Sequence, residues 1–132
     1  MLYETVAVLM PTYNGSKFIK AQIESIINQK KFPVHLYISD DGSNDDTLII
    51  LDDYFKKYPN IFKKLYKVNF KHPVKNYISL TLKVPEYKYY AFADQDDVWF
   101  EDKLIHSISK LNEGYSLYGG RVQVTDENLK TI

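Results

Sequence analysis

Short apolar segments alternate with helical stripes along this sequence, and that alternation limits the folds that it can adopt. Val6 to Met10 is a continuous apolar run, typical of a strand covered on both faces, and Pro11 to Gly15 ends it. The next apolar residues recur at the spacing of one helix face and are Ile19, Ile23, Ile26 and Ile27. Such alternation predicts an α/β fold, a three-layer sandwich in which helices cover both faces of a mainly parallel sheet.

The same alternation continues along the rest of the chain. Further strands are expected at Val34 to Ser39, Leu65 to Val68, Tyr89 to Ala93 and Tyr115 to Val124. Three further helices are expected. The first carries Leu48, Leu51 and Phe55, and the second spans Asn76 to Lys83. The third ends near Gly114 and carries Leu104, Ile105, Ile108 and Leu111. Ser16 is expected to cap the first helix, and Ser43 and Asp46 have the spacing of a capping box before the second.

The amino-acid composition excludes several classes of function for this chain. The 132 residues suit one domain, and 45% hydrophobic residues allow one buried core. Lys plus Arg equals Asp plus Glu at 17 each, so no overall field attracts nucleic acid or an anionic membrane. The absence of cysteine excludes disulfides and zinc-thiolate sites, and the three histidines are scattered. We expect neither a signal peptide nor a bilayer-spanning segment.

An acidic cluster follows the apolar run at Tyr89 to Ala93. Asp94, Asp96 and Asp97 place three carboxylates within four positions, and they repel one another unless a cation, a basic side chain or solvent relieves them. Extended backbone would point the side chains of Asp94 and Asp96 to one side of the chain. Mg²⁺ and Mn²⁺ prefer such oxygen ligands, so a divalent metal site is one interpretation and a solvated strand end is the other.

Three polar loops are expected at the same edge of the sheet. Ligands of parallel sheets bind beyond the carboxyl ends of the strands. Pro11 to Gly15, Asp40 to Ser43 and Asp94 to Asp97 each follow a predicted strand. We therefore expect these loops to converge on one crevice, which favours a metal or nucleotide site.

Three motifs, in their order along the chain, resemble those of a known family. They are Val6 to Asn14, Asp40-Asp41-Gly42-Ser43-x-Asp45, and Phe92-Ala93-Asp94-Gln95-Asp96-Asp97-Val98-Trp99. Together they resemble the Rossmann-like, nucleotide-binding N-terminal half of family 2 glycosyltransferases with the GT-A fold, in particular bacterial rhamnosyltransferases. The resemblance implies inverting sugar transfer from a UDP- or dTDP-linked donor to a saccharide or lipid-linked acceptor, in surface polysaccharide synthesis. It implies a cytoplasmic protein at the inner face of the membrane and no nucleic acid partner.

The resemblance also implies roles for individual residues. Asp41 or Asp40 would accept the imide N–H of a uracil or thymine, and one of the two would serve only the turn. The residues implied to line the nucleotide site are Pro11, Thr12, Tyr13, Asp40, Asp41, Lys75, Asn76, Asp94 and Gln95. Asp96 would coordinate Mg²⁺ or Mn²⁺ directly, with Asp94 nearby, and the metal would bridge the two donor phosphates.

The family's acceptor site and general base lie in a second half, downstream of the last strand expected here. We therefore expect residues 1–132 to form a single nucleotide-sugar-binding domain truncated before that half, with the catalytic base beyond Ile132. Asp126 and Glu127 are more simply an exposed acidic turn. Such a chain would bind a nucleotide, transfer little or no sugar, and self-associate through its uncovered faces.

Three other classes match the sequence less well. Asp94-x-Asp96 loosely matches the nucleophile motif of haloacid-dehalogenase-like phosphatases, in which Asp94 would attack phosphorus and Asp96 would act as acid and base. That motif belongs on the first strand, however, whereas here it follows a late one. Receiver domains would require acidic residues after the first strand, where this chain has Pro11 to Asn14. A nucleotide-binding module without activity is the remaining alternative.

Overall fold

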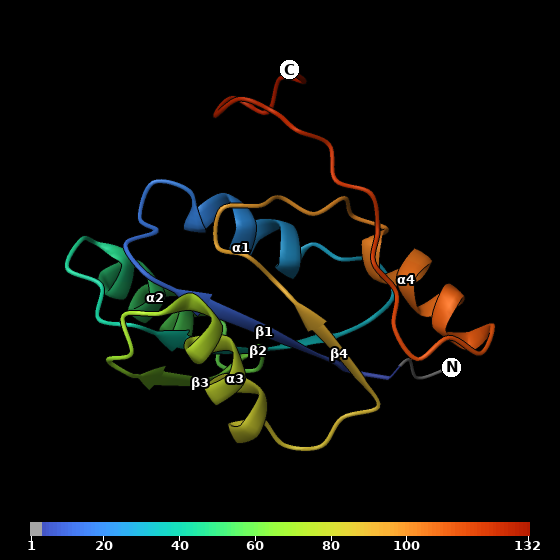
Figure 1. Cartoon of the computed structure of the whole chain (residues 1–132), viewed down its shortest axis with the longest axis horizontal. Helices are drawn as coiled ribbons and strands as arrows, with labels where there is room; N and C mark the ends of the chain where they lie inside the picture. Colours follow the sequence, from blue (N-terminus) through green and yellow to red (C-terminus); the bar gives the residue numbers. More distant parts are fainter. Residues whose placement is uncertain (1–3) are drawn as a thin grey trace.

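Four parallel strands form the sheet in the computed structural model, which describes residues 4–132 (Figure 1). Their spatial order is β3-β2-β1-β4, and β1 is hydrogen-bonded to β2 and β4, with Val6 opposite both Val34 and Tyr89. The strands are β1 (Val6–Thr12), β2 (Val34–Asp40), β3 (Phe62–Lys67) and β4 (Tyr89–Phe92). This sheet confirms the predicted parallel α/β architecture.

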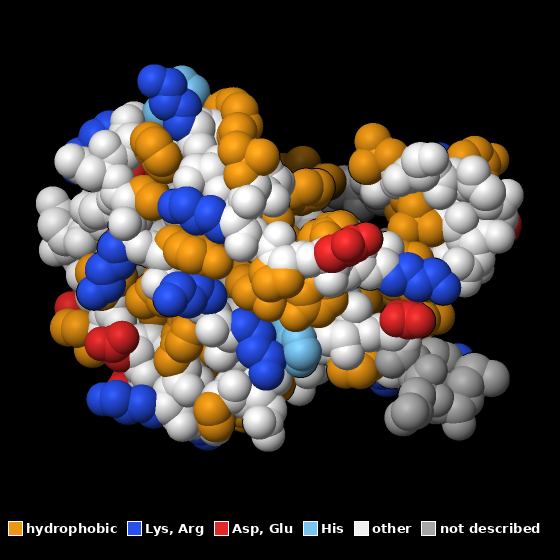
Figure 2. All heavy atoms as spheres, turned by 90° about the horizontal axis from the view of Figure 1, so that it is seen from below, with side chains coloured by type: hydrophobic (Ala, Val, Ile, Leu, Met, Phe, Trp, Pro, Cys, Tyr) orange, Lys and Arg blue, Asp and Glu red, His pale blue; other side chains and the backbone are white. Residues whose placement is uncertain are grey.

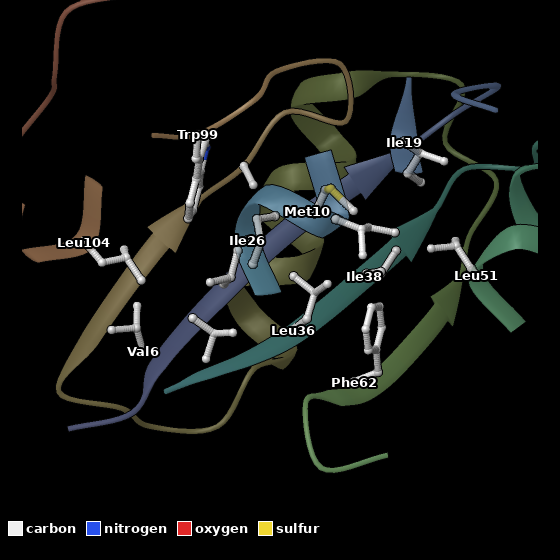
Figure 3. Packing of buried hydrophobic residues seen from close by; sticks show 14 of the residues in the cluster. Val6, Met10, Ile19, Ile26, Leu36, Ile38, Leu51, Phe62, Trp99 and Leu104 are labelled. Carbon is white, nitrogen blue, oxygen red and sulfur yellow. The ribbon is translucent and has the colours of Figure 1, made fainter. Parts of the chain in front are cut away.

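Helices cover both faces of the sheet and complete three layers. They are α1 (Ile19–Ile27), α2 (Thr47–Lys57), α3 (Pro73–Lys83) and α4 (Lys103–Asn112). Alternate residues of β1 divide the core: Val6, Val8 and Met10 pack with α1, α2 and α4, as Figure 3 shows in part. Ala7 and Leu9 pack beneath α3 on the other face. The apolar run of β1 is continuous because both of its faces are covered.

Two elements begin earlier than the sequence predicts. β3 begins at Phe62, not Leu65, because an edge strand keeps its exposed lysines, Lys63 and Lys64, on the surface and so lacks a clear apolar pattern. α3 begins at Pro73, not Asn76. Proline fits the first helical position, and the Nδ1 of His72 at the N-cap accepts the backbone N–H of Lys75.

The prediction of a last strand at Tyr115 to Val124 is wrong. In the described residues this segment has no strand, and the only pairing beyond it is an isolated antiparallel bridge between Thr125 and Thr131. Apart from Tyr118, its residues are exposed, with Leu117 and Val122 each 82% exposed. The segment leaves the sheet after α4 and runs along the outside of the molecule (Figure 1).

The predicted serine caps are also wrong. α1 follows Phe18, α2 follows Asp46, and neither N-cap side chain accepts a hydrogen bond. The polar groups serve the loops instead: the N–H of Ser16 donates to Asp45, and the hydroxyl of Ser43 donates to Asp40. These groups therefore form hydrogen bonds within and between loops instead of capping the helices.

Among residues 4–132, no helix has both the length and the apolar character needed to cross a bilayer.

Candidate functional site

A cavity of about 460 Å³ lies beyond the carboxyl ends of β1, β2 and β4. It is lined by Pro11, Thr12, Tyr13, Asp41, Lys71, His72, Pro73, Asn76, Tyr77, Asp94, Gln95 and Asp96. All three polar loops contribute to this lining, which confirms the predicted convergence. The start of α3 closes the remaining side.

Side chains of the second loop hold the first loop in place. Asp45 accepts the N–H of Ser16 at 3.1 Å and both the N–H and the hydroxyl of Thr47, at 2.9 and 2.5 Å. The hydroxyl oxygen of Thr47 in turn accepts the N–H of Gly15 at 2.9 Å. Burial alone would raise the pKa of Asp45, but these hydrogen bonds hold it at about 2. Ionised Asp45 therefore stabilises the loop arrangement around the cavity.

Replacing Asp45 by Asn is expected to lower the free energy of unfolding by about 1–2 kcal/mol at pH 7. The folded-state pKa of Asp45 lies below its unfolded value, so its contribution is present above about pH 4 and is lost as the pH falls toward 2. Urea unfolding at pH 7 and pH 3 should show the deficit shrinking at the lower pH. Asp46→Asn is the control, because the Asp46 side chain makes no capping bond. Equal effects of both substitutions would contradict this account.

Asp40 and Asp41 have different environments. Asp40 lies outside the cavity, and its carboxylate accepts the Thr12 hydroxyl at 2.7 Å and both the N–H and the hydroxyl of Ser43, at 2.9 and 2.6 Å. Asp41 lines the cavity. Its carboxylate accepts three backbone N–H groups, from residues 70, 71 and 72, at 2.6 to 3.0 Å. Burial favours the neutral form of Asp41, but these bonds lower its pKa.

The start of α3 contributes a buried amide. The Asn76 side chain donates to the backbone oxygen of Ser39 at 2.9 Å, and its own Oδ1 is buried without a hydrogen-bond partner. Asn76 lines the cavity, so a ligand there could supply the missing donor. Lys75, by contrast, has an exposed side chain outside the cavity lining.

Gln95 fixes the backbone of Tyr13 across the cavity rim. The Tyr13 N–H donates to Gln95 Oε1 at 3.0 Å, and Gln95 Nε2 donates to the Tyr13 oxygen at 2.8 Å. The ring of Tyr13 stays 46% exposed, with the Lys71 ammonium 5.5 Å from its centre. Gln95 thus links the first loop to the acidic loop and leaves the Tyr13 ring free to contact a ligand.

This pairing accounts for the glycine at position 15. A Cβ there would lie 2.3 Å from Gln95 Oε1. Gly15→Ala is expected to displace Gln95 and lower the free energy of unfolding by about 1–3 kcal/mol, measured by urea unfolding. Gly119→Ala is the matched control, because a Cβ at Gly119 meets nothing within 4 Å. A Gly15→Ala variant as stable as the control would contradict this role of Gln95.

Tyr77 of α3 orders the acidic loop. Its hydroxyl donates to Asp94 Oδ1 at 2.7 Å and approaches the backbone oxygen of Ala93 at 3.1 Å. Burial, reinforced by repulsion from Asp94 and Asp96, raises the pKa of Asp97. The loop is therefore strongly anionic.

The donor set of this loop fits a hard cation. Only two carboxylates, Asp94 and Asp96, line the cavity from this loop, and residues 4–132 contain no cluster of three or more His, Cys, Asp or Glu suited to a metal. Mg²⁺ is commonly held by one or two carboxylates together with substrate phosphates. The residues present thus suit a metal that arrives with a phosphorylated ligand.

Polar side chains of α1 and of Gln29, two residues after it, support the acidic loop from behind. Gln22 Nε2 donates to the Asp94 oxygen at 2.7 Å, and the Ser25 hydroxyl oxygen accepts the Trp99 N–H at 3.0 Å. Gln29 donates to the Phe100 oxygen at 2.7 Å. Trp99 itself packs in the core (Figure 3). The loop is therefore held at several points along its length.

Sequence reasoning missed four residues of the cavity lining: Lys71, His72, Pro73 and Tyr77. The His72-Pro73 pair was the available signal, because proline favours the first turn of a helix and would have placed residues 71–73 at the edge of the sheet. Tyr77 had no comparable signal, since its contact with Asp94 depends on the packing of α3.

The fold and comparisons with known proteins define the class. The α/β structure is similar to part of the GT-A fold of glycosyltransferases, as in Staphylococcus aureus TarS 1–349 in complex with UDP, with a TM-score of 0.70 and 27% identity. That likeness covers 83% of this chain and 32% of TarS 1–349. The sequence profile described as Glycosyl transferase family 2 matches residues 7–132, so the chain belongs to glycosyltransferase family 2.

Curated relatives and a further structure agree with this assignment. The dTDP-rhamnosyl transferase RfbG of Shigella flexneri is 42% identical over 105 residues, covering 77% of this chain and 36% of RfbG. The UDP-Glc:alpha-D-GlcNAc-diphosphoundecaprenol beta-1,3-glucosyltransferase WfgD of Escherichia coli is 29% identical over 128 residues, covering 93% and 47%. The chain thus spans less than half the length of both. The mannosyltransferase PcManGT of Pyrobaculum calidifontis, at 20% identity, shares the fold, with a TM-score of 0.73 over 83% of this chain and 32% of that one.

Proposed function

We propose that this chain provides the donor site of a bacterial glycosyltransferase of polysaccharide synthesis. The enzyme would transfer a sugar from a UDP- or dTDP-linked donor to a hydroxyl of a saccharide or lipid-linked acceptor. One observation carries the proposal: Tyr13, Asp41 and the Asp94-x-Asp96 pair line a single cavity. The donor class follows from RfbG, named for dTDP-rhamnose transfer, and from TarS, described with UDP.

The base and ribose would occupy the side of the cavity formed by Pro11, Thr12 and Tyr13. The Tyr13 ring offers exposed apolar surface for the base. Asp41 is the better candidate for the imide N–H, because it lines the cavity and its Oδ2 accepts only one backbone N–H. Asn76 Oδ1 is a second acceptor without a partner.

Asp94 and Asp96 would hold Mg²⁺ or Mn²⁺ against the two phosphates of the donor. The metal would supply positive charge that stabilises the departing nucleoside diphosphate. Tyr77 positions the Asp94 carboxylate by its hydrogen bond to Oδ1, and Gln22 anchors the Asp94 backbone. These side chains keep the acidic pair in place before the donor binds.

A second cavity, of about 620 Å³, lies between the acidic loop, α4 and residues 118–129, and Asp96 lines it as well. We propose that the sugar and the acceptor approach through this space, for inverting transfer.

Asp126 lies in an exposed turn and accepts the N–H groups of Asn128 and Lys130, while Glu127 pairs with Lys17. We propose neither carboxylate as the general base and expect that base in the part of the relatives' length that this chain does not span. The chain alone would bind nucleotide and transfer little sugar.

Calorimetric titration of UDP and dTDP into the purified chain, with and without Mn²⁺, tests the proposal. We expect binding that Mn²⁺ strengthens, with the tighter nucleotide identifying the base. ADP is the control, because its base lacks an imide N–H. A folded chain that binds neither UDP nor dTDP, or that binds ADP equally well, would overturn the proposal.

Because WfgD is named for a diphosphoundecaprenol-linked acceptor, we also propose that the chain works in the cytoplasm at the inner face of the membrane.

A further inference from the structure

Positive charge is concentrated in one stretch of this electroneutral chain. Residues 62–92 contain seven of the 17 basic residues but only one of the 17 acidic residues, Glu86. This stretch comprises β3 and β4, the two edge strands of the sheet, and α3, which packs on the sheet face between them (Figure 1). The local charge is therefore strongly positive although the overall charge is zero.

The outer face of α3 presents an apolar stripe within this region. Val74, Ile78 and Leu82 lie at i, i+4 and i+8, and they are 57%, 54% and 82% exposed. The opposite face of the helix is buried through Asn76 and Leu80. An exposed stripe of this kind is unusual for a helix that already packs on a sheet, because an apolar face in water is costly.

Exposed aromatic side chains of β4 extend the stripe. Phe92 is 52% exposed, and its ring lies 5.9 Å from that of Tyr77 on α3. Tyr90, two residues earlier on the same face of the strand, is 45% exposed. Apolar surface therefore continues from the helix onto the edge of the sheet.

Lysines of the same stretch lie beside the end of α3. Lys64 of β3 and Lys83 of α3 both lie over the ring of Tyr66, at 5.8 and 5.1 Å from its centre. Within residues 4–132 the ion pairs involve Lys17, Lys30 and Lys110, so no lysine of the 62–92 stretch is paired with a carboxylate. Figure 2, seen from the side of β3 and the end of α3, shows lysine side chains scattered among hydrophobic ones.

We propose that this α3 face docks on an anionic lipid bilayer. Helices with an apolar stripe flanked by lysines bind in the plane of the interface, where the stripe enters the headgroup region and the lysines contact anionic lipids. The charge of the stretch complements such a surface. Lys71 and His72, just before α3, line the donor cavity, so docking here would hold that cavity close to the membrane. Docking through this surface requires no bound nucleotide.

Vesicle sedimentation of the purified chain tests this docking. We expect binding to phosphatidylcholine vesicles that contain phosphatidylglycerol, no binding to phosphatidylcholine alone, and weakening of the binding by salt. Ile78→Glu should weaken partitioning about tenfold or more. Ile49→Glu is the matched control, because Ile49 is 63% exposed on α2, across the sheet from α3. Lys64→Glu with Lys83→Glu should also lose about tenfold, compared with Lys56→Glu and Lys57→Glu on α2.

Absence of binding to the anionic vesicles would overturn the proposal, as would equal losses in the α2 controls. A dimer that Ile78→Glu dissociates in sedimentation velocity, without vesicle binding, would assign the face to a second copy and would also overturn it. Circular dichroism of each variant separates a lost surface from a lost fold.

Discussion

Asp41→Ala is expected to lower the free energy of unfolding by about 3–5 kcal/mol. The substitution removes a buried carboxylate that accepts the backbone N–H groups of Phe70, Lys71 and His72. Hydrogen bonds to a charged acceptor are stronger than neutral ones, and here three donors would lose their partner together. Urea unfolding monitored by circular dichroism at pH 7 measures the effect.

The pH dependence separates this role from simple packing. The Asp41 pKa is lowered in the folded chain, so its contribution is present above its unfolded pKa of about 4 and is lost as the pH falls below that value. The deficit of Asp41→Ala should therefore shrink at pH 3. Asp53→Ala on the exposed side of α2 is the control. A deficit below about 1 kcal/mol at pH 7 would show that the amides of residues 70–72 do not depend on Asp41.

Buried elements could be predicted from the sequence because their side chains carry the pattern of their environment. β1 and β2 are covered on both faces, and α1 has one buried stripe, so continuous apolar runs and helical spacing identified them. β3 lies at the edge of the sheet, and its consecutive exposed lysines interrupt the apolar pattern, so its start was missed. The apolar pattern of the valines and leucine after α4 predicts a strand, but these side chains are exposed and do not pack on the sheet.

The location of the site could be predicted from the sequence, because it depends on which loops follow the strands. The loops after β1, β2 and β4 converge because parallel strands bring their carboxyl ends to one edge. Which aspartate faces the cavity was not predictable, because Asp40 and Asp41 are neighbours with the same local sequence. The difference arises from partners distant in the sequence. The Thr12 hydroxyl donates to Asp40, and backbone N–H groups of residues 70–72 donate to Asp41. Tyr77 was missed for the same reason, since only tertiary packing places its hydroxyl beside Asp94.

Asp96→Ala is expected to abolish the strengthening of UDP or dTDP binding by Mn²⁺, weakening binding in the presence of Mn²⁺ by about 100-fold. Asp96 is exposed in the acidic loop and lines both cavities, so its carboxylate can reach a cation shared with the donor phosphates. Calorimetric titration with and without Mn²⁺ measures the effect. Glu101→Ala, which removes an exposed carboxylate outside both cavity linings, is the control.

Two further readouts distinguish loss of a metal ligand from damage to the site. Uridine lacks phosphates, so its binding should be the same in Asp96→Ala and in the unaltered chain. The free energy of unfolding should stay the same or rise slightly, because Asp96 repels Asp97 and helps to raise its pKa. If Mn²⁺ still strengthens nucleotide binding in Asp96→Ala, the metal is held by other groups, and the proposed pairing of Asp94 with Asp96 is wrong. If uridine binding is lost as well, Asp96 shapes the pocket rather than coordinating the metal.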